Sequence, residues 1–472
     1  MNQVLNITLG QLHAWLPQSR LVGNANDVFS RVHTDTRTLS QGDVFVALKG
    51  DRFDGHDFLA QLKGLGISAA IATHGLAEAG LMGLELDDTR WALGRIAQAW
   101  RAQFSLPLIA VTGSNGKTTV TQMIASILHA WQGKDALATQ GNFNNDIGVP
   151  LTLLRLQQHN RSAVLELGMN RPGEIANLAS LCMPTVALVN NAQREHQEFM
   201  HSVQAVATEN GAVLSALPAH GVAVFPADDE HTGVWRHLAV GKEVLSFGRT
   251  AKSDVHLLSS TWVDQHWQLS VHTPLGPLST HLSVAGEHNV HNALAAISCA
   301  VAAKVPLDMI EQGLAAFEPV AGRSRSMPLT VNHRQLLLID DTYNANPDSV
   351  RAAIDLLAQS PQPRVLVLGD MGEVGTQGPE FHAEVGRYAQ ASGIEYLITL
   401  GELSRHSAKV FSNAKHCTSI DEVNAQVLAL LPAVATVLIK GSRFMRMERV
   451  VQAVQSWVHT QTSSTAAEAS CS

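Results

Sequence analysis

Residues 106–119 read LPLIAVTGSNGKTT, an apolar, strand-like run followed by a turn that holds two glycines. A helix-like stretch from Val120 to Trp131 comes next. The backbone N–H groups of such a turn and the helix N-terminus behind it form a cradle for an anion. The lysine adds a positive charge, and a threonine hydroxyl can bind Mg²⁺. The stretch therefore predicts a site for a nucleotide triphosphate, formed by Gly113, Ser114, Asn115, Gly116, Lys117, Thr118 and Thr119.

The turn is a shortened form of the common P-loop pattern. That pattern has a glycine five residues before Gly116, where this chain has Val111, and the upstream glycine here is Gly113. A plain strand-to-helix turn with an exposed lysine is the alternative. Phosphate binding is favoured because strand, glycines, lysine, hydroxyls and helix occur in the order that a phosphate loop requires.

The composition indicates a globular protein. The chain has 472 residues, enough for about three domains. Hydrophobic residues make up 45% and charged residues 16%, which is unlike a disordered chain. The net charge is −8 and there is no long basic run, so nucleic acid is not an expected partner.

The N-terminus and the cysteines indicate a cytoplasmic location. Met1-Asn2-Gln3-Val4 lacks the features of a signal peptide, and no run of 18 or more apolar residues predicts a membrane span. The four cysteines are widely spaced, which favours a reducing compartment over a disulfide framework or a zinc site: Cys182, Cys299, Cys417 and Cys471.

The order of strand-like and helix-like segments predicts an α/β protein of three domains and a tail. Residues 1–85 form a small α/β unit, and residues 86–317 form a central P-loop ATPase-like domain with a parallel sheet. Residues 318–460 form a Rossmann-like unit without a G-x-G-x-x-G motif, so dinucleotide binding is not supported. The Ser-, Thr- and Ala-rich residues 461–472 are predicted to be a disordered tail.

Polar residues that follow apolar strands are the candidates for chemistry, because such strand ends form the active edge of open α/β sheets. Glu166 ends the strand-like run 162–167 and suits a Mg²⁺ ligand, although a surface ion pair is the alternative. His196 closes the polar run 190–196 and could bind a second metal ion, although a lone histidine is more often structural or solvated.

Three further groups have chemistry that suits a ligand. The loop 141–148, GNFNNDIG, could bind a polar substrate through its amides or could be an ordinary turn. Asn289 and Asn292 share one helix face and match the edge of adenine, although capping would explain Asn289. Arg323 starts the third unit and could stabilise charge on a transferring phosphoryl group, unless it lies in a solvated linker.

Taken together, these motifs resemble the ATP-dependent Mur ligases of peptidoglycan synthesis, over nearly the whole chain except the tail. TGSNGKTT is similar to that family's phosphate loop, which folylpolyglutamate synthases share. The other matching motifs are TDTR (34–37), GDVFVALKG (42–50), DGH (54–56), GNFNNDIGVPLTLL (141–154), ELGMN (166–170), DDTYNANPDS (340–349) and LGDMGE (368–373).

The resemblance implies a reaction in cell-wall biosynthesis, with ATP and Mg²⁺ as cofactors. ATP would phosphorylate the peptide carboxylate of UDP-N-acetylmuramoyl-tripeptide, and the amine of D-Ala-D-Ala would attack the acyl phosphate. Two anions must meet for this and water must be excluded, so we expect the third domain to close over the second. We also expect a monomer.

The resemblance also implies roles for individual residues. Lys117 would contact the ATP phosphates, Thr118 and Glu166 the first Mg²⁺, and His196 the second. The remaining roles are adenine binding by Asn289 and Asn292, γ-phosphate binding by Arg323, nucleotide contact from the third domain by Asp341 and Asn344, binding at the UDP end by Thr36 and Arg37, and peptide binding by Asn145 and Asn170.

One position departs from the family pattern. Several relatives carry a lysine, carbamylated by CO₂, that bridges to the second Mg²⁺. No lysine occurs here between Arg194 and Lys242, and Asn210 stands at the corresponding position with Glu209 beside it. We hypothesise that this chain does without the carbamate and that Glu209 supplies the missing charge.

Two other functions are alternatives. A sibling ligase that adds the third amino acid, or one that adds a glutamate to folate, is the nearest enzymatic alternative. The third-residue ligase would show a D-N-P-R motif in its last domain, and this chain lacks one. A nucleotide-driven switch or binding protein would turn over ATP without a peptide substrate, and it would leave the polar loops without a purpose. The sequence does not decide whether the third residue of the peptide is meso-diaminopimelate or lysine.

Overall fold

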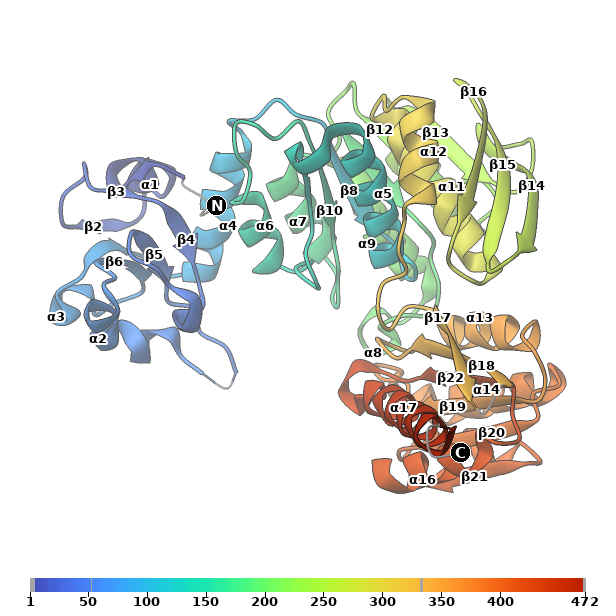
Figure 1. Cartoon of the computed structure of the whole chain (residues 1–472). Coiled ribbons are helices and arrows are strands. Elements are labelled where there is room, and N and C mark those ends of the chain that lie inside the picture. The colour runs from blue at the N-terminus through green and yellow to red at the C-terminus, as the bar shows by residue number, and fades with distance from the viewer. Residues whose placement is uncertain (1–4, 52, 332–333, 470–472) are drawn as a thin grey trace.

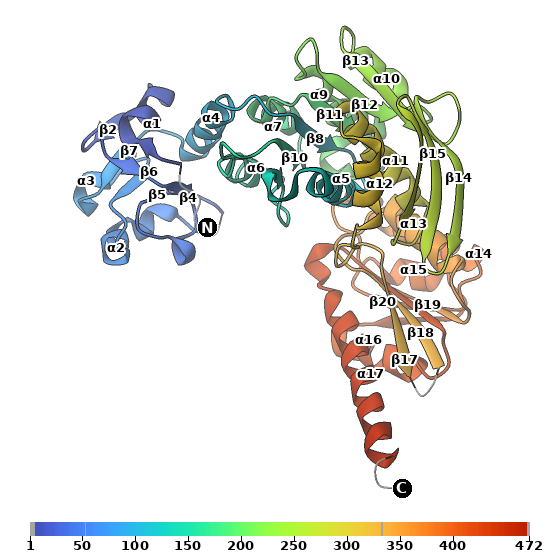
Figure 2. The ribbon, with the colours of Figure 1, turned by 45° about the horizontal axis from the view of Figure 1, so that its top comes forward.

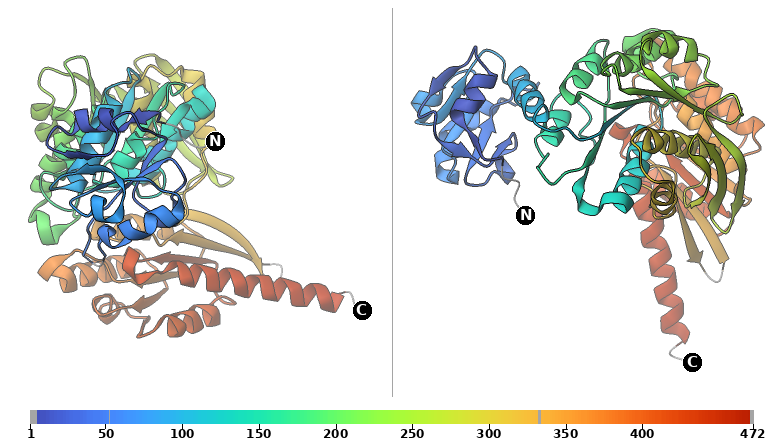
Figure 3. Two further views of the ribbon diagram at one scale, coloured as in Figure 1. Left: turned by 90° about the vertical axis from the view of Figure 1, so that its left-hand side faces the viewer. Right: turned by 90° about the horizontal axis from the view of Figure 1, so that it is seen from above.

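The computed structural model describes residues 5–51, 53–331 and 334–469 (Figure 1). Each of its three α/β domains is built on a sheet of its own, so the predicted fold class is confirmed. The N-terminal domain lies at one end of the central domain and the C-terminal domain packs on another side of it (Figures 1 and 3). No helix within the described ranges is long and apolar enough to cross a membrane.

The N-terminal domain has a five-stranded sheet in which only the edge strand β2 is antiparallel to its neighbour. A separate pair, β1 and β3, lies beside it. In spatial order the strands are β2 (Arg20–Val22), β7 (Met82–Glu85), β6 (Ala69–Ala72), β5 (Asp43–Val46) and β4 (Arg31–His33), with β1 (Ile7–Thr8), β3 (Val28–Phe29) and helices α1 (Leu9–Trp15), α2 (Leu59–Leu62) and α3 (Leu76–Ala79).

Helix α4 (Thr89–Arg101) joins the first two domains. Its N-terminus is capped by Asp88, whose side chain accepts from the N–H groups of Arg90 and Trp91. The buried face of α4, with Leu93 and Ile96, belongs to one hydrophobic cluster that continues from the N-terminal domain into the central domain. Apolar burial rather than a flexible linker therefore connects the two domains.

The central domain has a nine-stranded sheet, parallel from β9 to β14 and extended by two antiparallel strands. The segment 244–284, which reads as a separate β-rich insertion, therefore continues the main sheet. The spatial order is β16 (Gly276–Leu282), β15 (His266–Thr273), β14 (Val255–Val263), β13 (Glu243–Gly248), β12 (Val222–Pro226), β11 (Val186–Val189), β8 (Leu108–Thr112), β10 (Ser162–Glu166) and β9 (Ala136–Ala138).

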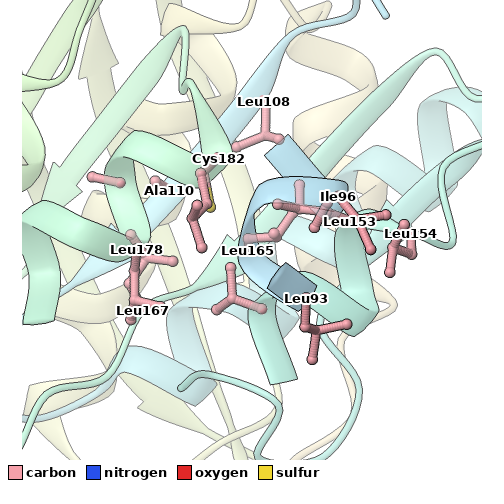
Figure 4. Close-up of a cluster of buried hydrophobic side chains, with 14 of the residues drawn as sticks. Leu93, Ile96, Leu108, Ala110, Leu153, Leu154, Leu165, Leu167, Leu178 and Cys182 are labelled. Atoms are coloured by element: carbon pink, nitrogen blue, oxygen red, sulfur yellow. The ribbon is translucent and has the colours of Figure 1, made fainter. Parts of the chain in front are cut away.

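Both faces of this sheet are covered, which explains why its strands are continuously apolar. Leu108 and Ala110 of β8 belong to the cluster with α4, α6 and α7, shown in Figure 4, while Ile109 and Val111 belong to the cluster with α5 and α11. The helices are α5 (Lys117–Gln132), α6 (Gly148–Leu153), α7 (Glu174–Cys182), α8 (Gln197–Met200), α9 (Val203–Ser215), α10 (Thr232–Leu238), α11 (Glu287–Ala302) and α12 (Leu307–Ala315).

The C-terminal domain has a six-stranded sheet, parallel except for β17 at one edge. The spatial order is β17 (Arg325–Val331), β18 (Arg334–Asp341), β22 (Thr436–Lys440), β19 (Arg364–Gly369), β20 (Tyr396–Leu400) and β21 (Ala414–Cys417), and the helices are α13 (Pro347–Ala358), α14 (Gly378–Ala391), α15 (Arg405–Lys409), α16 (Ile420–Leu430) and α17 (Glu448–Ala469).

The end of the chain differs from the expected disordered tail. Helix α17 continues to Ala469 and points away from the domain (Figure 2), while residues 470–472 lie outside the described residues. Its first turns are anchored because Val450, Val454 and Val458 recur every four residues and are buried against the sheet. Alanine, glutamate and glutamine further along favour helix, so the helix propagates beyond its packed part.

Candidate active site

A cleft of about 1090 Å³ opens where the central and C-terminal domains meet. The phosphate loop, the ends of β10 and β11, and residues of the C-terminal domain line it. The predicted site residues in its wall are Ser114, Asn115, Gly116, Lys117, Thr118, Thr119, Asn145, Glu166, Asn170, His196, Asn289, Asn292, Arg323, Asp341 and Asn344. Three other predicted site residues do not line this cleft: Gly113, Thr36 and Arg37.

The phosphate loop needs both of its glycines. Gly113 and Gly116 have φ angles of +131° and +82°, which L side chains rarely adopt. A Cβ on Gly116 would lie 2.4 Å from Oδ1 of Asn292 and 2.7 Å from Nδ2 of Asn190. The loop is therefore packed tightly against α11 and the end of β11, and helix α5 starts directly behind it at Lys117.

Lys117 contacts an acid that sequence reasoning passed over. Its Nζ donates to the carbonyl oxygens of Gly113 and Ser114, and it lies 3.3 Å from Oε2 of Glu195. Glu195 lines the cleft and is only 5% exposed. The sequence did show that Glu195 lies in the polar run that follows a buried strand. It gave no reason to choose Glu195 over the other polar residues of that run.

Two oxygen-bearing side chains could hold a cation beside the phosphate loop. β10 pairs with β8 so that Glu166 lies opposite Val111, next to the loop, and Thr118 is the second residue of α5. Glu166 is 2% exposed and accepts a hydrogen bond of 2.7 Å from Nδ2 of Asn144. Carboxylate and hydroxyl oxygens suit Mg²⁺.

The described residues contain no group of three or more His, Cys, Asp or Glu side chains placed to hold a metal ion. A cation at Thr118 and Glu166 would therefore complete its shell with phosphate oxygens and water, which is how Mg²⁺ usually binds with nucleotides. The donor set fits a metal ion that arrives with its nucleotide.

His196 lies on the opposite side of the loop in a left-handed conformation, with a φ of +47°. Its Nδ1 is 2.6 Å from Oε2 of Glu373 in the C-terminal domain, and its Nε2 is 3.8 Å from Oε2 of Glu195. The contact with His196 lowers the pKa of Glu373, so this acid is ionised near neutral pH. Nε2, not Nδ1, is therefore the ring nitrogen that faces Glu195.

Asn289 and Asn292 form a network inside the protein. Nδ2 of Asn292 donates to Oδ1 of Asn289 at 2.9 Å, and Nδ2 of Asn190 donates to Oδ1 of Asn292 at 3.0 Å. Asn289 donates to the carbonyl of Ala285 at 2.7 Å and is not the helix cap, which is Gly286. These amides fasten α11 to the end of β11, and their contact with adenine stays a prediction.

The C-terminal side of the cleft carries two cations. The Arg323 guanidinium stacks 4.0 Å from the ring centre of Tyr343, and its buried Nε has no hydrogen-bond partner among the described residues. Lys440, which sequence reasoning missed, ends β22 and is 3% exposed. Its Nζ lies 2.6 Å from Oδ2 of Asp341 and donates to the carbonyl of Asn344 at 3.0 Å.

Several contacts join the two domains across the cleft. Arg194 reaches Asp348 on α13 at 2.6 Å and Glu384 on α14 at 2.8 Å. Asn346 Nδ2 donates to Oδ1 of Asn115 in the phosphate loop at 2.9 Å. The hydrogen bonds that Arg194 donates to Glu384 and Asp348 raise the pKa of Arg194, and the bond to Arg194 lowers the pKa of Glu384. The C-terminal domain therefore packs on the phosphate loop, as expected if it closes over the central domain.

Sequence profiles of three Mur ligase domains match this architecture. The Mur ligase family catalytic domain matches residues 28–101, the Mur ligase middle domain residues 111–300, and the Mur ligase glutamate ligase domain residues 327–443. The UDP-N-acetylmuramoyl-tripeptide–D-alanyl-D-alanine ligase of Escherichia coli (strain K12) is 39% identical, over 96% of this chain and 99% of its own length. The chain belongs to the Mur ligase family.

Other Mur ligases extend this similarity. The enzyme of the same name from Haemophilus influenzae is 36% identical over 94% of this chain and 97% of its own length. A crystal structure of MurF from Acinetobacter baumannii has a TM-score of 0.89 and 33% identity, covering 95% of this chain and 98% of that one. The MurF ligase from Thermotoga maritima, at 24% identity and a TM-score of 0.81, shares the fold.

The structure corrects the hypothesis about Glu209 in this Mur ligase. The Glu209 carboxylate accepts hydrogen bonds of 2.9 Å from the N–H groups of Gly173 and Ile175 at the start of α7, and it does not line the cleft. The charge of Glu209 therefore stabilises the N-terminus of α7 and is not available to a metal ion in the cleft. Asn210 does reach the phosphate loop, because its Oδ1 accepts from the N–H of Gly113 at 2.9 Å.

The residues expected to bind the sugar nucleotide and the peptide are in separate places. Thr36 and Arg37 form a short turn, η1 (Thr36–Thr38), in the N-terminal domain, where hydrogen bonds from Arg37 lower the pKa of Asp35 to about 2. Asn145 and Asn170 lie in the cleft wall. Oδ1 of Asn145 accepts from the N–H of Gly148 at 2.8 Å, which fixes the start of α6. Their substrate contacts stay predictions.

Proposed function

We propose that this Mur ligase joins D-Ala-D-Ala to UDP-N-acetylmuramoyl-tripeptide with ATP and Mg²⁺, through an acyl phosphate. The observation that carries the proposal is a single cleft lined by the phosphate loop, by the buried carboxylate of Glu166 and by Arg323 of the C-terminal domain. The similarity to ligases of this name over almost their whole length supports the choice of substrates.

The first task of the site is to bring two anions together. A carboxylate is a poor electrophile, and its phosphorylation creates a leaving group. Lys117 and Arg323 lie in the cleft wall, where they would offset the repulsion between the peptide carboxylate and the γ-phosphate. Mg²⁺ held by Thr118 and Glu166 would neutralise further phosphate charge.

The second task is to protect the activated carboxylate from water. The contacts of Arg194 and Asn346 hold the C-terminal domain against the phosphate loop and narrow the access of solvent. The D-Ala-D-Ala amine then attacks the acyl carbon, the carbon–nitrogen bond forms, and the carbon–oxygen bond to phosphate breaks. The products are the amide, ADP and phosphate.

The phosphate loop, Glu166 and Arg323 of the same chain lie together in the cleft wall, and we propose that the monomer is the active unit. Because the reaction consumes ATP and a nucleotide-linked substrate, we place it in the cytoplasm. The peptide's third residue is left to experiment, with meso-diaminopimelate and lysine as the two forms to compare.

Phosphate release tests the proposal. We expect release only when ATP, UDP-N-acetylmuramoyl-tripeptide and D-Ala-D-Ala are all present, with the pentapeptide product detected by mass. Equal release without either acceptor would instead indicate a nucleotide-driven switch. Rapid joining of a single amino acid to the dipeptide nucleotide would indicate the sibling ligase.

A further inference from the structure

A buried carboxylate in the cleft has no role in the scheme above. Glu195 lies in the loop between β11 and α8 and is 5% exposed. Burying an ionised carboxylate is unfavourable unless other groups compensate its charge. The groups that surround Glu195 are therefore informative about what it does.

Each oxygen of Glu195 has a different environment. Oε1 accepts a hydrogen bond of 3.2 Å from Nδ2 of Asn210, and Oδ1 of the same Asn210 accepts from the N–H of Gly113. Asn210 thereby ties the carboxylate to the phosphate loop. Oε2 faces the cleft, 3.3 Å from Nζ of Lys117 and 3.8 Å from Nε2 of His196.

The facing atoms of Glu195 and His196 are both electron-pair donors. Nδ1 of His196 lies 2.6 Å from Oε2 of Glu373, and the neutral tautomer with its proton on Nδ1 has its lone pair on Nε2, the atom that faces Oε2 of Glu195. A carboxylate behind a histidine in this way is a common support for a metal-binding imidazole. Neighbouring ligands of an octahedral Mg²⁺ with bonds of ~2.1 Å lie ~3.0 Å apart. The two atoms are 3.8 Å apart without a cation, so a small side-chain movement would bring both of them onto one ion.

We propose that Glu195 and His196 together bind the second Mg²⁺ of this ligase, and that Asn210 is the positioning residue that orients Glu195. This inference rests on the proposed function, because the cation enters with the nucleotide. Lys117 is then released from Glu195 to contact the phosphates.

The arrangement also removes a need for CO₂. In relatives that carry a carbamylated lysine, the negative charge comes from CO₂ added to an amine. Asn210 stands at that position, and an amide nitrogen is not nucleophilic enough to take up CO₂. Glu195 supplies a permanent carboxylate on the same side of the phosphate loop, held directly by Asn210.

Manganese binding tests the proposal without relying on activity. Mn²⁺ is titrated into the full chain with a non-hydrolysable ATP analogue, and free Mn²⁺ is followed by electron paramagnetic resonance. We expect two Mn²⁺ per wild-type chain. In Glu195→Gln the first should bind normally and the second at least ten-fold more weakly. Two ions bound with unchanged affinity in this variant would overturn the proposal.

Two further variants separate metal binding from folding. Glu209→Gln alters the neighbouring buried acid that holds α7, so it should lower the melting temperature and keep both Mn²⁺ sites. Asn210→Ala keeps the carboxylate but removes its hydrogen bond together with the bond to the Gly113 N–H, so it should weaken the second Mn²⁺ site more than the first. If Glu195→Gln does not fold, Asn210→Ala decides, and unchanged Mn²⁺ affinity in it would overturn the role of both residues.

The dependence of activity on CO₂ provides an independent test of the proposal. Wild-type product formation in degassed, bicarbonate-free buffer should equal that with added bicarbonate. A several-fold increase on adding bicarbonate would refute the substitution of carboxylate for carbamate. ATP turnover without acceptors would refute the proposed function, but it would leave the count of bound Mn²⁺ unaffected, so the two failures are distinguishable.

Discussion

Arg194 offers the sharpest test of how the two domains close. Its guanidinium leaves the central domain and reaches two acids on different helices of the C-terminal domain, Asp348 and Glu384. It also lies 5.4 Å from the ring centre of Phe381. In Arg194→Ala all of these contacts are lost, and two carboxylates on the C-terminal side of the interface lose the cation that joins them to the central domain, while Glu384 keeps its contact with Arg351.

The size of the effect follows from the exposure of the groups. The three side chains are 22–28% exposed, between a surface pair and a buried one. We assign each ion pair about 1 kcal/mol, the upper part of the range for solvent-exposed pairs. A loss of about 2 kcal/mol shifts the ratio of closed to open molecules roughly 30-fold. We expect kcat to fall by about that factor.

Arg351→Ala is the matched control. Arg351 also contacts Glu384, at 3.1 Å, and stacks on Tyr388, but all three residues belong to the C-terminal domain. It should therefore leave closure and kcat nearly unchanged. The assays are steady-state phosphate release and small-angle X-ray scattering with the ATP analogue. Equal loss of kcat in both variants, or an Arg194→Ala protein as compact as the wild type, would refute the reasoning.

The remaining predictions concern the phosphate loop, the asparagine network that packs against it, and the effect of low pH on domain closure. Lys117→Ala should abolish joining of D-Ala-D-Ala at the level of the chemical step, and full-rate product formation in this variant would contradict its role. Gly116→Ala combines a left-handed φ, worth about 1–2 kcal/mol of strain, with a collision at Asn292, so calorimetry should show nucleotide affinity at least ten-fold weaker. Asn292→Ala leaves Oδ1 of Asn289 unpaired and removes one of the two hydrogen bonds of Asn190 Nδ2, so it should lower the free energy of unfolding, measured in urea, by about 2 kcal/mol. An unchanged free energy of unfolding would show that this amide network does not stabilise the fold. The pKa of Glu384 is lowered by its hydrogen bonds to Arg194, so its contribution to closure is complete above its unfolded-state pKa and is lost as the pH falls through its folded-state pKa. Scattering at decreasing pH should show opening that is absent in Glu384→Gln, and identical profiles would contradict this.

Sequence reasoning worked where chemistry is encoded within one short segment. The order of strand, two glycines, lysine and threonine predicts the phosphate loop, since the positive φ values and the helix start are local properties of residues 112–118. The polar ends of β10 and β11 likewise predict where the cleft lies, because neighbouring parallel strands end at one edge.

It failed where the role of a charged residue depends on partners that are distant in the sequence. Glu209 and Glu195 are both buried acids, yet Glu209 accepts from Gly173, 36 residues away, while Glu195 faces the cleft. In the sequence, Lys440 is only the last residue of an apolar strand. Its role becomes visible in the structure, where it contacts Asp341, which is 99 residues away in the sequence. Residues 461–472 were expected to be a disordered tail from their composition, whereas helix α17, whose first turns are anchored by buried valines, continues to Ala469.

The sequence by itself determined the family, the three-domain α/β architecture and the phosphate loop, because these follow from periodicity, turn chemistry and motif order along the chain. Only the tertiary structure decided which buried charges face the cleft. The physical reason is that the free energy of a buried charge depends on partners brought together by packing, and those partners are distant in the sequence.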